Sequence, residues 1–168
     1  MTKQSQTALD YKFMSMAESI ASKSDDPHIE LGLSKGVGCL IVKQNMIISK
    51  SANTLPAKIA HKGVQVKPFS EERYQYIEHA ERSAIFKALM DNHDTTNSTL
   101  YCTRFPCSDC ARAIITSGVS RLVVKSGFGK EPDTTATHTR SWKNSQQTAL
   151  KMLRLAGITV RYLKAQVD

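Results

Sequence analysis

The chain has 168 residues and a mass of 18.6 kDa, which is the size of a single domain, and we predict one domain over residues 1–168. A composition of 40% hydrophobic and 23% charged residues excludes a disordered chain, and no run reaches the roughly 18 apolar residues of a membrane span. The formal net charge of +8 favours a phosphate-bearing partner, a nucleotide or a nucleic acid, although a basic surface alone gives the same composition.

The N-terminus and the cysteine content bear on the compartment. Residues 1–7 are polar with no apolar segment behind them, so no secretory signal is visible. Four cysteines are too few for a disulfide scaffold in a chain of this length. We therefore predict a cytoplasmic protein with reduced thiols.

The first half of the chain reads as a helix, a hairpin and a long loop. Apolar residues recur at helical spacing over 8–23, and Pro27 follows this segment. Two apolar stretches, 37–43 and 46–52, flank Gln44 and Asn45 and predict a β-hairpin. Residues 53–76 lack periodicity, which predicts a loop of functional interest.

Short helices and strands alternate in the second half. The predicted elements are a helix over 79–90, a strand over 98–103, a helix over 107–117 ended by Gly118, a strand over 121–125, a polar stretch over 126–141, a helix over 142–156 and a strand over 158–163. This order predicts an α/β fold, a three-layer α/β/α sandwich with a mixed five-stranded sheet. Its later strands should run parallel, and right-handed crossovers should lay helices on both faces.

Two short motifs carry residues that bind metals. His79-Ala80-Glu81 opens one predicted helix, and Pro106-Cys107-Ser108-Asp109-Cys110 opens the next. Two cysteines three positions apart at a helix start can direct both sulfurs at one ion, and His79 can supply a third ligand. Two thiolates and an imidazole favour Zn²⁺ over Mg²⁺ or Ca²⁺.

The number of ligands distinguishes a catalytic from a structural zinc site. Cys39 and Cys102 lie in predicted strands, where a small buried hydrophobe is the better interpretation. The remaining histidines lie in predicted loops without paired spacing: His28, His61, His93 and His138. Three protein ligands leave a fourth position for water, which is the arrangement of a catalytic zinc site.

Glu81 lies two positions after the proposed histidine ligand. A carboxylate there can take a proton from metal-bound water and pass it on. An isolated Glu in a first helical turn is more often a solvated residue favoured by the helix dipole, and Pro-Cys-x-x-Cys alone also occurs in zinc ribbons and redox pairs. Found together in this order, the two motifs have the known signature of zinc deaminases, so we interpret Glu81 as catalytic.

The sequence resembles the cytidine deaminase superfamily, and more closely its deoxycytidylate (dCMP) deaminase branch. The stretches that carry the resemblance are Glu-His-Ala-Glu-Arg-Ser-Ala-Ile at 78–85 and the segment 100–118, and the similarity extends over roughly residues 10–163. It implies that His79, Cys107 and Cys110 bind zinc and that Glu81 shuttles protons.

The resemblance also implies the chemistry and the substrate contacts. Zinc-bound hydroxide would attack C4 of cytosine, and dCMP would be hydrolysed to dUMP and ammonia. Asn53 would touch the sugar, and backbone groups near Ala80 and Phe105 would hold the ring edge of the base. The branch commonly has Gly-Tyr-Asn-Gly around the position of Asn53, a segment tied to triphosphate effectors, and this chain departs from it.

A nucleotide substrate needs cationic partners for its phosphate. Candidates flank the zinc motifs or follow them: Lys58, Lys62, Lys67, Arg73, Arg104, Arg140 and Lys143. Any one of them can equally be a solvated surface residue. Phe105, beside the metal motif, is the aromatic residue that we favour for stacking on a base.

Three functional readings compete. The first is a deaminase of dCMP, and the second a deaminase of tRNA, single-stranded nucleic acid or another nucleoside or base. Tyr76-Ile77-Glu78 precedes the zinc histidine where tRNA adenosine deaminases have an Asp-Pro pattern, which argues against tRNA. The third is a non-catalytic, zinc-stabilised interaction module, against which the intact Glu81 argues. Members of the resembled family form dimers or hexamers, so a homo-oligomer is implied.

Overall fold

The computed structural model of the protein describes residues 3–125 and 139–164 and contains a mixed five-stranded sheet. Its strands, in chain order, are β1 (Gly38–Lys43), β2 (Met46–Ala52), β3 (Thr99–Cys102), β4 (Arg121–Val124) and β5 (Thr159–Tyr162). They lie side by side in the order β2-β1-β3-β4-β5. Strand β1 is antiparallel to both β2 and β3, whereas β3, β4 and β5 are parallel to one another. The predicted mixed sheet with parallel later strands is confirmed.

The β1–β2 hairpin follows from its turn residues. Gln44 and Asn45 both have positive φ angles, 51° and 65°, as the two central residues of a type I′ turn require. Asn tolerates this left-handed backbone better than most residues, because its short side chain can hydrogen-bond locally.

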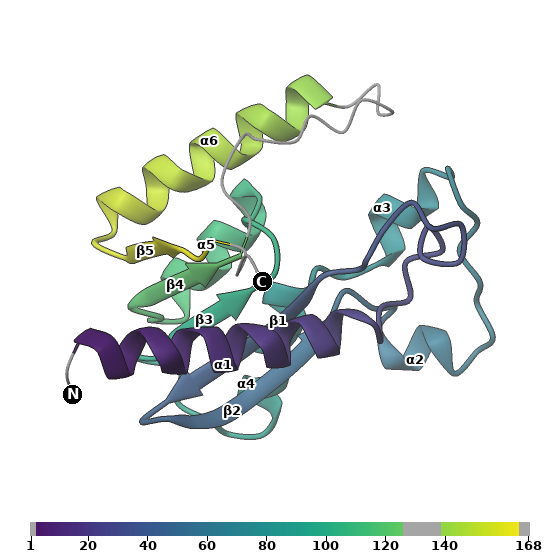
Figure 1. The fold of residues 1–168 in the computed structure, drawn as a ribbon. Coiled ribbons are helices and arrows are strands. Elements are labelled where there is room, and N and C mark those ends of the chain that lie inside the picture. Colours follow the sequence, from purple (N-terminus) through teal and green to yellow (C-terminus); the bar gives the residue numbers. More distant parts are fainter. Residues whose placement is uncertain (1–2, 126–138, 165–168) are drawn as a thin grey trace.

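Helices form the other two layers (Figure 1). They are α1 (Lys3–Ala21), α4 (Ala80–Met90), α5 (Ser108–Thr116) and α6 (Thr139–Leu155), whereas the short helices α2 (Ala57–Ala60) and α3 (Glu72–Tyr76) lie beyond one end of the sheet. The three-layer sandwich is confirmed, but the crossover helices α4, α5 and α6 all cover one face, and α1 alone covers the other. The reason is the strand order: the chain moves across the sheet in one direction from β2 to β5, so every right-handed crossover falls on the same side.

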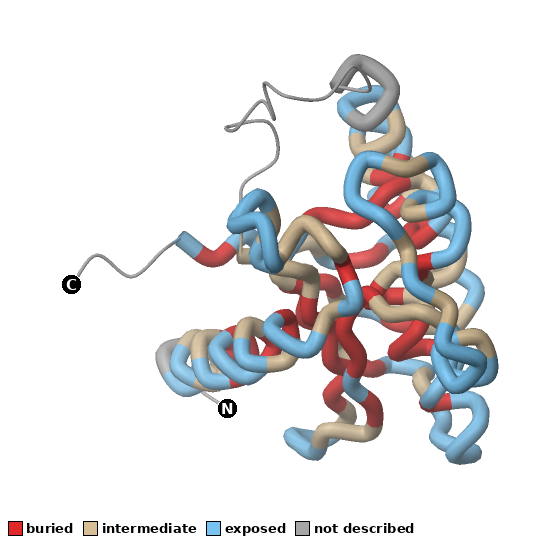
Figure 2. The backbone as a smooth tube through the Cα atoms, turned by 90° about the vertical axis from the view of Figure 1, so that its right-hand side faces the viewer, coloured by how far each residue is buried: buried red, intermediate tan, exposed pale blue. Residues whose placement is uncertain are grey.

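Side chains of the central strands alternate between two cores. Ile41, Leu100 and Leu122 pack with α4, α5 and α6, whereas Leu40 and Val123 pack with α1. Figure 2 shows this central part of the molecule as buried, while the helices expose their outer sides. Alternation of this kind is expected for strands that are covered on both faces.

The α1 face holds a buried ionic network. The Asp10 carboxylate is completely buried and receives two hydrogen bonds from Arg121, at 2.8 and 2.6 Å. Tyr101 donates to it at 2.8 Å, Gln6 donates at 3.0 Å, and Arg161 forms a further ion pair at 2.8 Å. The network therefore ties α1 to β3, β4 and β5.

Glycine allows α1 to approach the sheet closely. A Cβ atom at Gly38 would lie only 1.9 Å from the backbone oxygen of Ala17 and 2.6 Å from the backbone nitrogen of Ala21. The last turns of α1 can therefore lie against β1 only because residue 38 has no side chain.

The segment predicted as one loop, 53–76, contains the short helices α2 and α3. The Arg73 guanidinium in α3 binds both carboxylate oxygens of Asp26, each at 2.8 Å. The Phe69 ring packs against the His28 ring in a tilted arrangement, with centroids 4.6 Å apart and planes 46° apart. The segment is thus held against the loop that follows α1 at two points. The other predicted boundaries lie within a few residues of those observed, and most of the predicted polar stretch, 126–138, falls outside the described residues.

No helix among the described residues is long and apolar enough to cross a membrane.

Candidate metal centre and active site

The topology of the sheet brings the two predicted metal motifs to one edge. Strand β1 is antiparallel to both β2 and β3, so β2 and β3 run in the same direction. Helix α4 follows β2 in the chain, and helix α5 follows β3. The N-termini of both helices therefore lie at the same end of the sheet, with His79 as the N-cap of α4 and Cys107 as the N-cap of α5.

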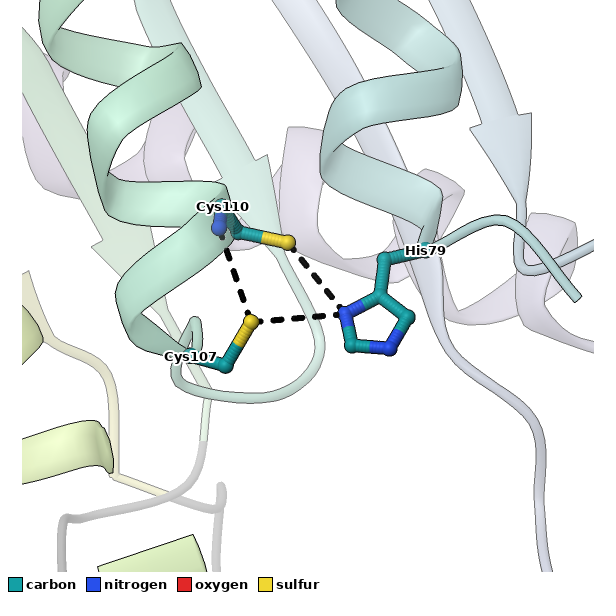
Figure 3. A group of neighbouring side chains, drawn as sticks. All are labelled: His79, Cys107 and Cys110. Atoms are coloured by element: carbon teal, nitrogen blue, oxygen red, sulfur yellow. Dashed lines mark hydrogen bonds between the residues drawn. The ribbon is translucent and has the colours of Figure 1, made fainter. Parts of the chain in front are cut away.

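Three side chains converge between these helix starts (Figure 3). The Nδ1 atom of His79 lies 3.3 Å from the Sγ atom of Cys110 and 3.5 Å from the Sγ atom of Cys107. The three ligand atoms all lie within 4.8 Å of one another. In a tetrahedral zinc site with Zn–N of about 2.0 Å and Zn–S of about 2.3 Å, the N···S separation is about 3.5 Å. The observed geometry fits a zinc ion bound through Nδ1 and two sulfurs.

The other candidate ligands lie elsewhere. Cys39 and Cys102 are fully buried and face each other on β1 and β3, as small core residues. His28 packs on Phe69, and His138 falls outside the described residues. Among the described residues, the only group of histidine, cysteine and acidic side chains spaced to hold a metal is His79, Cys107 and Cys110. Three ligands leave one tetrahedral position open, as in catalytic zinc sites.

The protons of this cluster are shared unequally. Hydrogen bonds from the Cys110 thiol and the His79 ring lower the pKa of Cys107 to about 4. The Cys107 sulfur and burial raise the pKa of Cys110, and the hydrogen bond to Cys107 raises the pKa of His79. A divalent cation bound to these three side chains would displace the protons of the thiols, because metal ligands must be deprotonated.

Glu81 lies in the first turn of α4 and is only 4% exposed. Burial raises the pKa of its carboxyl group, the charge of His79 lowers it, and a hydrogen bond with Cys110 also lowers it. On balance the pKa of Glu81 is raised, and its carboxyl group lies close enough to the metal-binding group for the His79 charge to act on it. The alternative that Glu81 is a solvated first-turn residue is wrong.

The His79 side of the site is held by its neighbour in the sequence. One carboxylate oxygen of Glu78 accepts the backbone N–H of His79 at 2.9 Å, and the other accepts from Arg82 at 3.0 Å. Glu78 also pairs with Thr54 in an isolated antiparallel bridge, with N···O distances of 3.1 and 2.9 Å. This bridge links the start of α4 to the segment that carries Asn53.

The side chain of Asn53 is oriented by the backbone. The Oδ1 atom of Asn53 accepts a hydrogen bond of 2.7 Å from the backbone N–H of Val37. The backbone N–H of Asn53 donates to the backbone oxygen of Val37 at 3.0 Å. These bonds fix the Asn53 side chain against Val37, while the next residue, Thr54, is paired with Glu78 before the start of α4.

The remaining predicted contacts differ in availability. Ala80 is fully buried at the first position of α4, and its helix has no side-chain cap. The Phe105 ring is 2% exposed and stacks on Tyr162, with centroids 6.0 Å apart and planes 13° apart, so it has no free face for a base. Arg104 is exposed, whereas Arg73, one of the phosphate candidates, is occupied by Asp26.

A small pocket of about 180 Å³ lies beside His79. It is lined by Pro56, Tyr74, Gln75, Tyr76, Ile77, Glu78, His79, Arg82 and Asp109. Neither Glu81 nor Asn53 lines it, so it adjoins the metal site on the side of α3 and does not contain the proposed chemistry.

Two polar residues of α6, Ser145 and Gln146, touch the metal-binding turn and were not predicted from the sequence. Gln146 donates from Nε2 to the backbone oxygen of Phe105 at 3.0 Å, and Ser145 binds Ser108 through two contacts of 2.9 Å. No local sequence signal marks them, because they are distant in sequence from the turn that they contact.

Comparison with known proteins gives one consistent result. The model of the family described as "Cytidine and deoxycytidylate deaminase zinc-binding region" matches residues 7–126. An uncharacterized deaminase from Aliivibrio fischeri is 31% identical over 93% of this chain and 94% of its own length. The deoxycytidylate deaminase of Homo sapiens is 26% identical over 89% of this chain and 76% of its length. The crystal structure of dCMP deaminase from cyanophage S-TIM5 superposes with a TM-score of 0.67 at 21% identity, covering 97% of this chain and all of the phage chain.

Proposed function

Because the chain belongs to the cytidine and deoxycytidylate deaminase family, and is thus a zinc-dependent deaminase, we propose that it converts dCMP to dUMP and ammonia. The observation that carries the proposal is the buried Glu81 carboxyl group in the first turn of α4, beside a His79–Cys107–Cys110 group that leaves one metal position open. The choice of dCMP is supported by relatives that are named deoxycytidylate deaminases and are aligned over most of this chain.

Each residue has a defined part in the proposed reaction. Zinc, when bound, supplies the Lewis acidity that makes a water molecule a nucleophile near neutral pH. The Glu81 carboxylate accepts a proton from that water and delivers it to N3 of the cytosine ring. A second proton then passes through Glu81 to the amino group on C4. The C4–N bond breaks, ammonia leaves, and the oxygen from water becomes O4 of uracil.

The burial of Glu81 suits this role. An apolar, water-poor environment raises the pKa of a carboxyl group and lets it exchange protons at lower cost. The N-termini of α4 and α5 add positive potential at this site, which favours negative charge that develops in the transition state.

The substrate contacts form the second part of the proposal. The backbone N–H of Ala80, at the uncapped start of α4, is a suitable donor to the edge of the base. The side chain of Asn53 is held in place by Val37 and would meet the sugar. Backbone groups around Phe105 would contact the base, since its ring is covered by Tyr162.

We assign the phosphate to Arg104, three residues before Cys107. Its guanidinium is exposed and forms no ion pair with any residue in the described ranges. Arginine that is not already paired with a carboxylate is well suited to bind a phosphate dianion. Replacing Arg104 with Ala should raise KM for dCMP with little effect on deoxycytidine, and the same change at exposed Arg154 is the control.

A substrate panel tests the proposal as a whole. Zinc-loaded protein is incubated with dCMP, cytidine, tRNA and a cytosine-containing oligonucleotide, and ammonia release is measured for each. The expected result is the highest kcat/KM with dCMP and production of dUMP. Faster release from tRNA or the oligonucleotide would overturn the small-nucleotide assignment, and release from none of the four would overturn the deamination of cytosine nucleotides altogether.

We also propose that the protein is a homo-oligomer. Helix α4 exposes Phe86, Leu89 and Met90 at 44%, 72% and 80%, an apolar stripe at helical spacing. Exposed apolar side chains that cluster on one element are typical of an interaction surface. Light scattering of the purified protein should give a mass that is a multiple of 18.6 kDa.

A further inference from the structure

Helix α6 contacts the turn that carries the first cysteine ligand. Gln146 donates a hydrogen bond of 3.0 Å to the backbone oxygen of Phe105. The Oγ atom of Ser145 accepts the backbone N–H of Ser108 at 2.9 Å and lies 2.9 Å from the hydroxyl of Ser108. Two adjacent residues of α6 therefore hold backbone groups on both sides of Cys107.

These contacts fix the direction of the Cys107 side chain. Phe105 precedes the ligand by two residues, Ser108 follows it by one, and Pro106 between them is almost fully buried. With its backbone held from the α6 side, the turn directs the sulfur of Cys107 toward His79 on α4 (Figure 3). The N–H of Ser108 is also one of the donors that α5 itself leaves unsatisfied at its N-terminus.

Helix α6 is a firm support for this turn. Ala149 and Leu153 are completely buried in the core shared with α4 and α5. Ser145 and Gln146, one turn earlier on the same helix, are half-buried. Both residues lie outside the segment 7–126 that matches the zinc-binding region of the family.

We propose that Ser145 and Gln146 are positioning residues for the metal centre, acting through the Phe105–Ser108 turn on the Cys107 ligand. When a residue that orients a metal ligand without touching the metal is replaced, the metal affinity typically falls by about 10- to 100-fold. The C-terminal helix is thus a part of the zinc site, although it supplies no ligand. This inference rests on the metal centre and is independent of which nucleotide is the substrate.

The decisive variant is Gln146→Glu. Glu has the shape of Gln but replaces the donating amide with a carboxylate that would face the carbonyl of Phe105. We expect zinc affinity, measured by competition with a chromophoric chelator, to fall by about 10- to 100-fold. Gln147→Glu, the same change at the exposed neighbouring position, should leave the affinity unchanged and controls for the added charge. Wild-type affinity in Gln146→Glu would overturn the proposal.

A second pair of variants separates positioning from general stability. Ser145→Ala removes one oxygen atom and should weaken zinc binding, whereas Ser145→Thr keeps the hydroxyl and should restore it. The thermal unfolding of the metal-free proteins should be similar, and the visible spectrum of the cobalt-substituted protein should change only in Ser145→Ala. An effect of Ser145→Ala on the metal-free melting temperature, with unchanged zinc affinity and an unchanged cobalt spectrum, would show a merely structural role.

Discussion

The two faces of the sheet differ in how they treat charge. On the α1 face, the buried Asp10 carboxylate is surrounded by donors from four elements, α1, β3, β4 and β5. On the opposite face, an apolar core with a few hydrogen-bonded serines between β2 and α4 extends to one edge, where His79, Cys107 and Cys110 converge from two helix starts. A fully satisfied network contributes to stability and offers nothing to a ligand, whereas a convergent group with an open position can bind one.

This contrast predicts a separation of effects. Substitutions at the edge of the α4–α5 face should remove metal or turnover from a protein that still folds. Substitutions in the Asp10 network should reduce the folded population while leaving each folded molecule active.

The largest effect is expected for Cys110→Ala. The variant loses one of the three proposed ligands, so the purified protein should contain far less than one zinc ion per chain. Deamination should be undetectable. Metal content by elemental analysis and ammonia release are the two measurements. Cys39→Ala, at a buried cysteine that is not a ligand, should keep its zinc. Full zinc occupancy in Cys110→Ala would require another ligand, for which Cys102 is the nearest candidate in the sequence.

Glu81→Gln should have the next largest effect. The amide keeps the size of the side chain but cannot carry a proton between water, N3 and the leaving amine. We expect kcat to fall by about 100- to 10,000-fold, with zinc content and melting temperature close to wild type. Turnover within a few-fold of wild type would refute the proton-shuttle assignment while leaving the metal site intact.

Asp10→Ala tests the other face. The change leaves Arg121 and Arg161 without their shared carboxylate, and breaking a buried ion pair in this way typically costs about 3–5 kcal/mol of unfolding free energy. Denaturant unfolding measures the cost, and kcat per folded molecule should not change. Asp91→Ala, at an exposed carboxylate after α4, should cost far less. A loss of zinc in folded Asp10→Ala protein would contradict the separation of the two faces.

Local sequence signals predicted that His79, Cys107 and Cys110 come together, because the spacing within each motif is short. His79 lies at the start of α4, and Cys107 and Cys110 lie at the start of α5. The relative position of the two cysteines is therefore set by a single helical turn. Helical and strand periodicity likewise predicted α4, α5 and the strands to within a few residues. Such patterns are local, so tertiary contacts had little to change.

The interactions that local patterns did not predict are long-range. Tyr162 covers the ring of Phe105, and Arg73 is paired with an aspartate 47 positions away. Neither partner can be identified from spacing, because the sheet and the loops bring them together. The short helices α2 and α3, with four and five residues, contain too few turns to produce a periodic pattern.

The smallest expected effect is a pH dependence of stability that belongs to the α1 face. Burial acts to raise the pKa of Asp10, but hydrogen bonds from Arg121, Gln6 and Tyr101 outweigh it, so the pKa in the folded state lies below the ordinary value of 3.8. A lowered pKa stabilises the folded state above the pKa of the unfolded chain, and this stabilisation is lost as the pH falls through the folded value.

The contribution of Asp10 should therefore be constant near pH 7 and decline below about pH 4. Denaturant midpoints between pH 7 and pH 3 measure this dependence, and wild type should lose more stability over that range than Asp10→Ala. Asp26, whose pKa is also lowered, remains in both proteins and supplies a common background. Equal losses in the two proteins would mean that the Asp10 network is not held by its ionised carboxylate, and that the α1 face owes its stability to its apolar contacts alone.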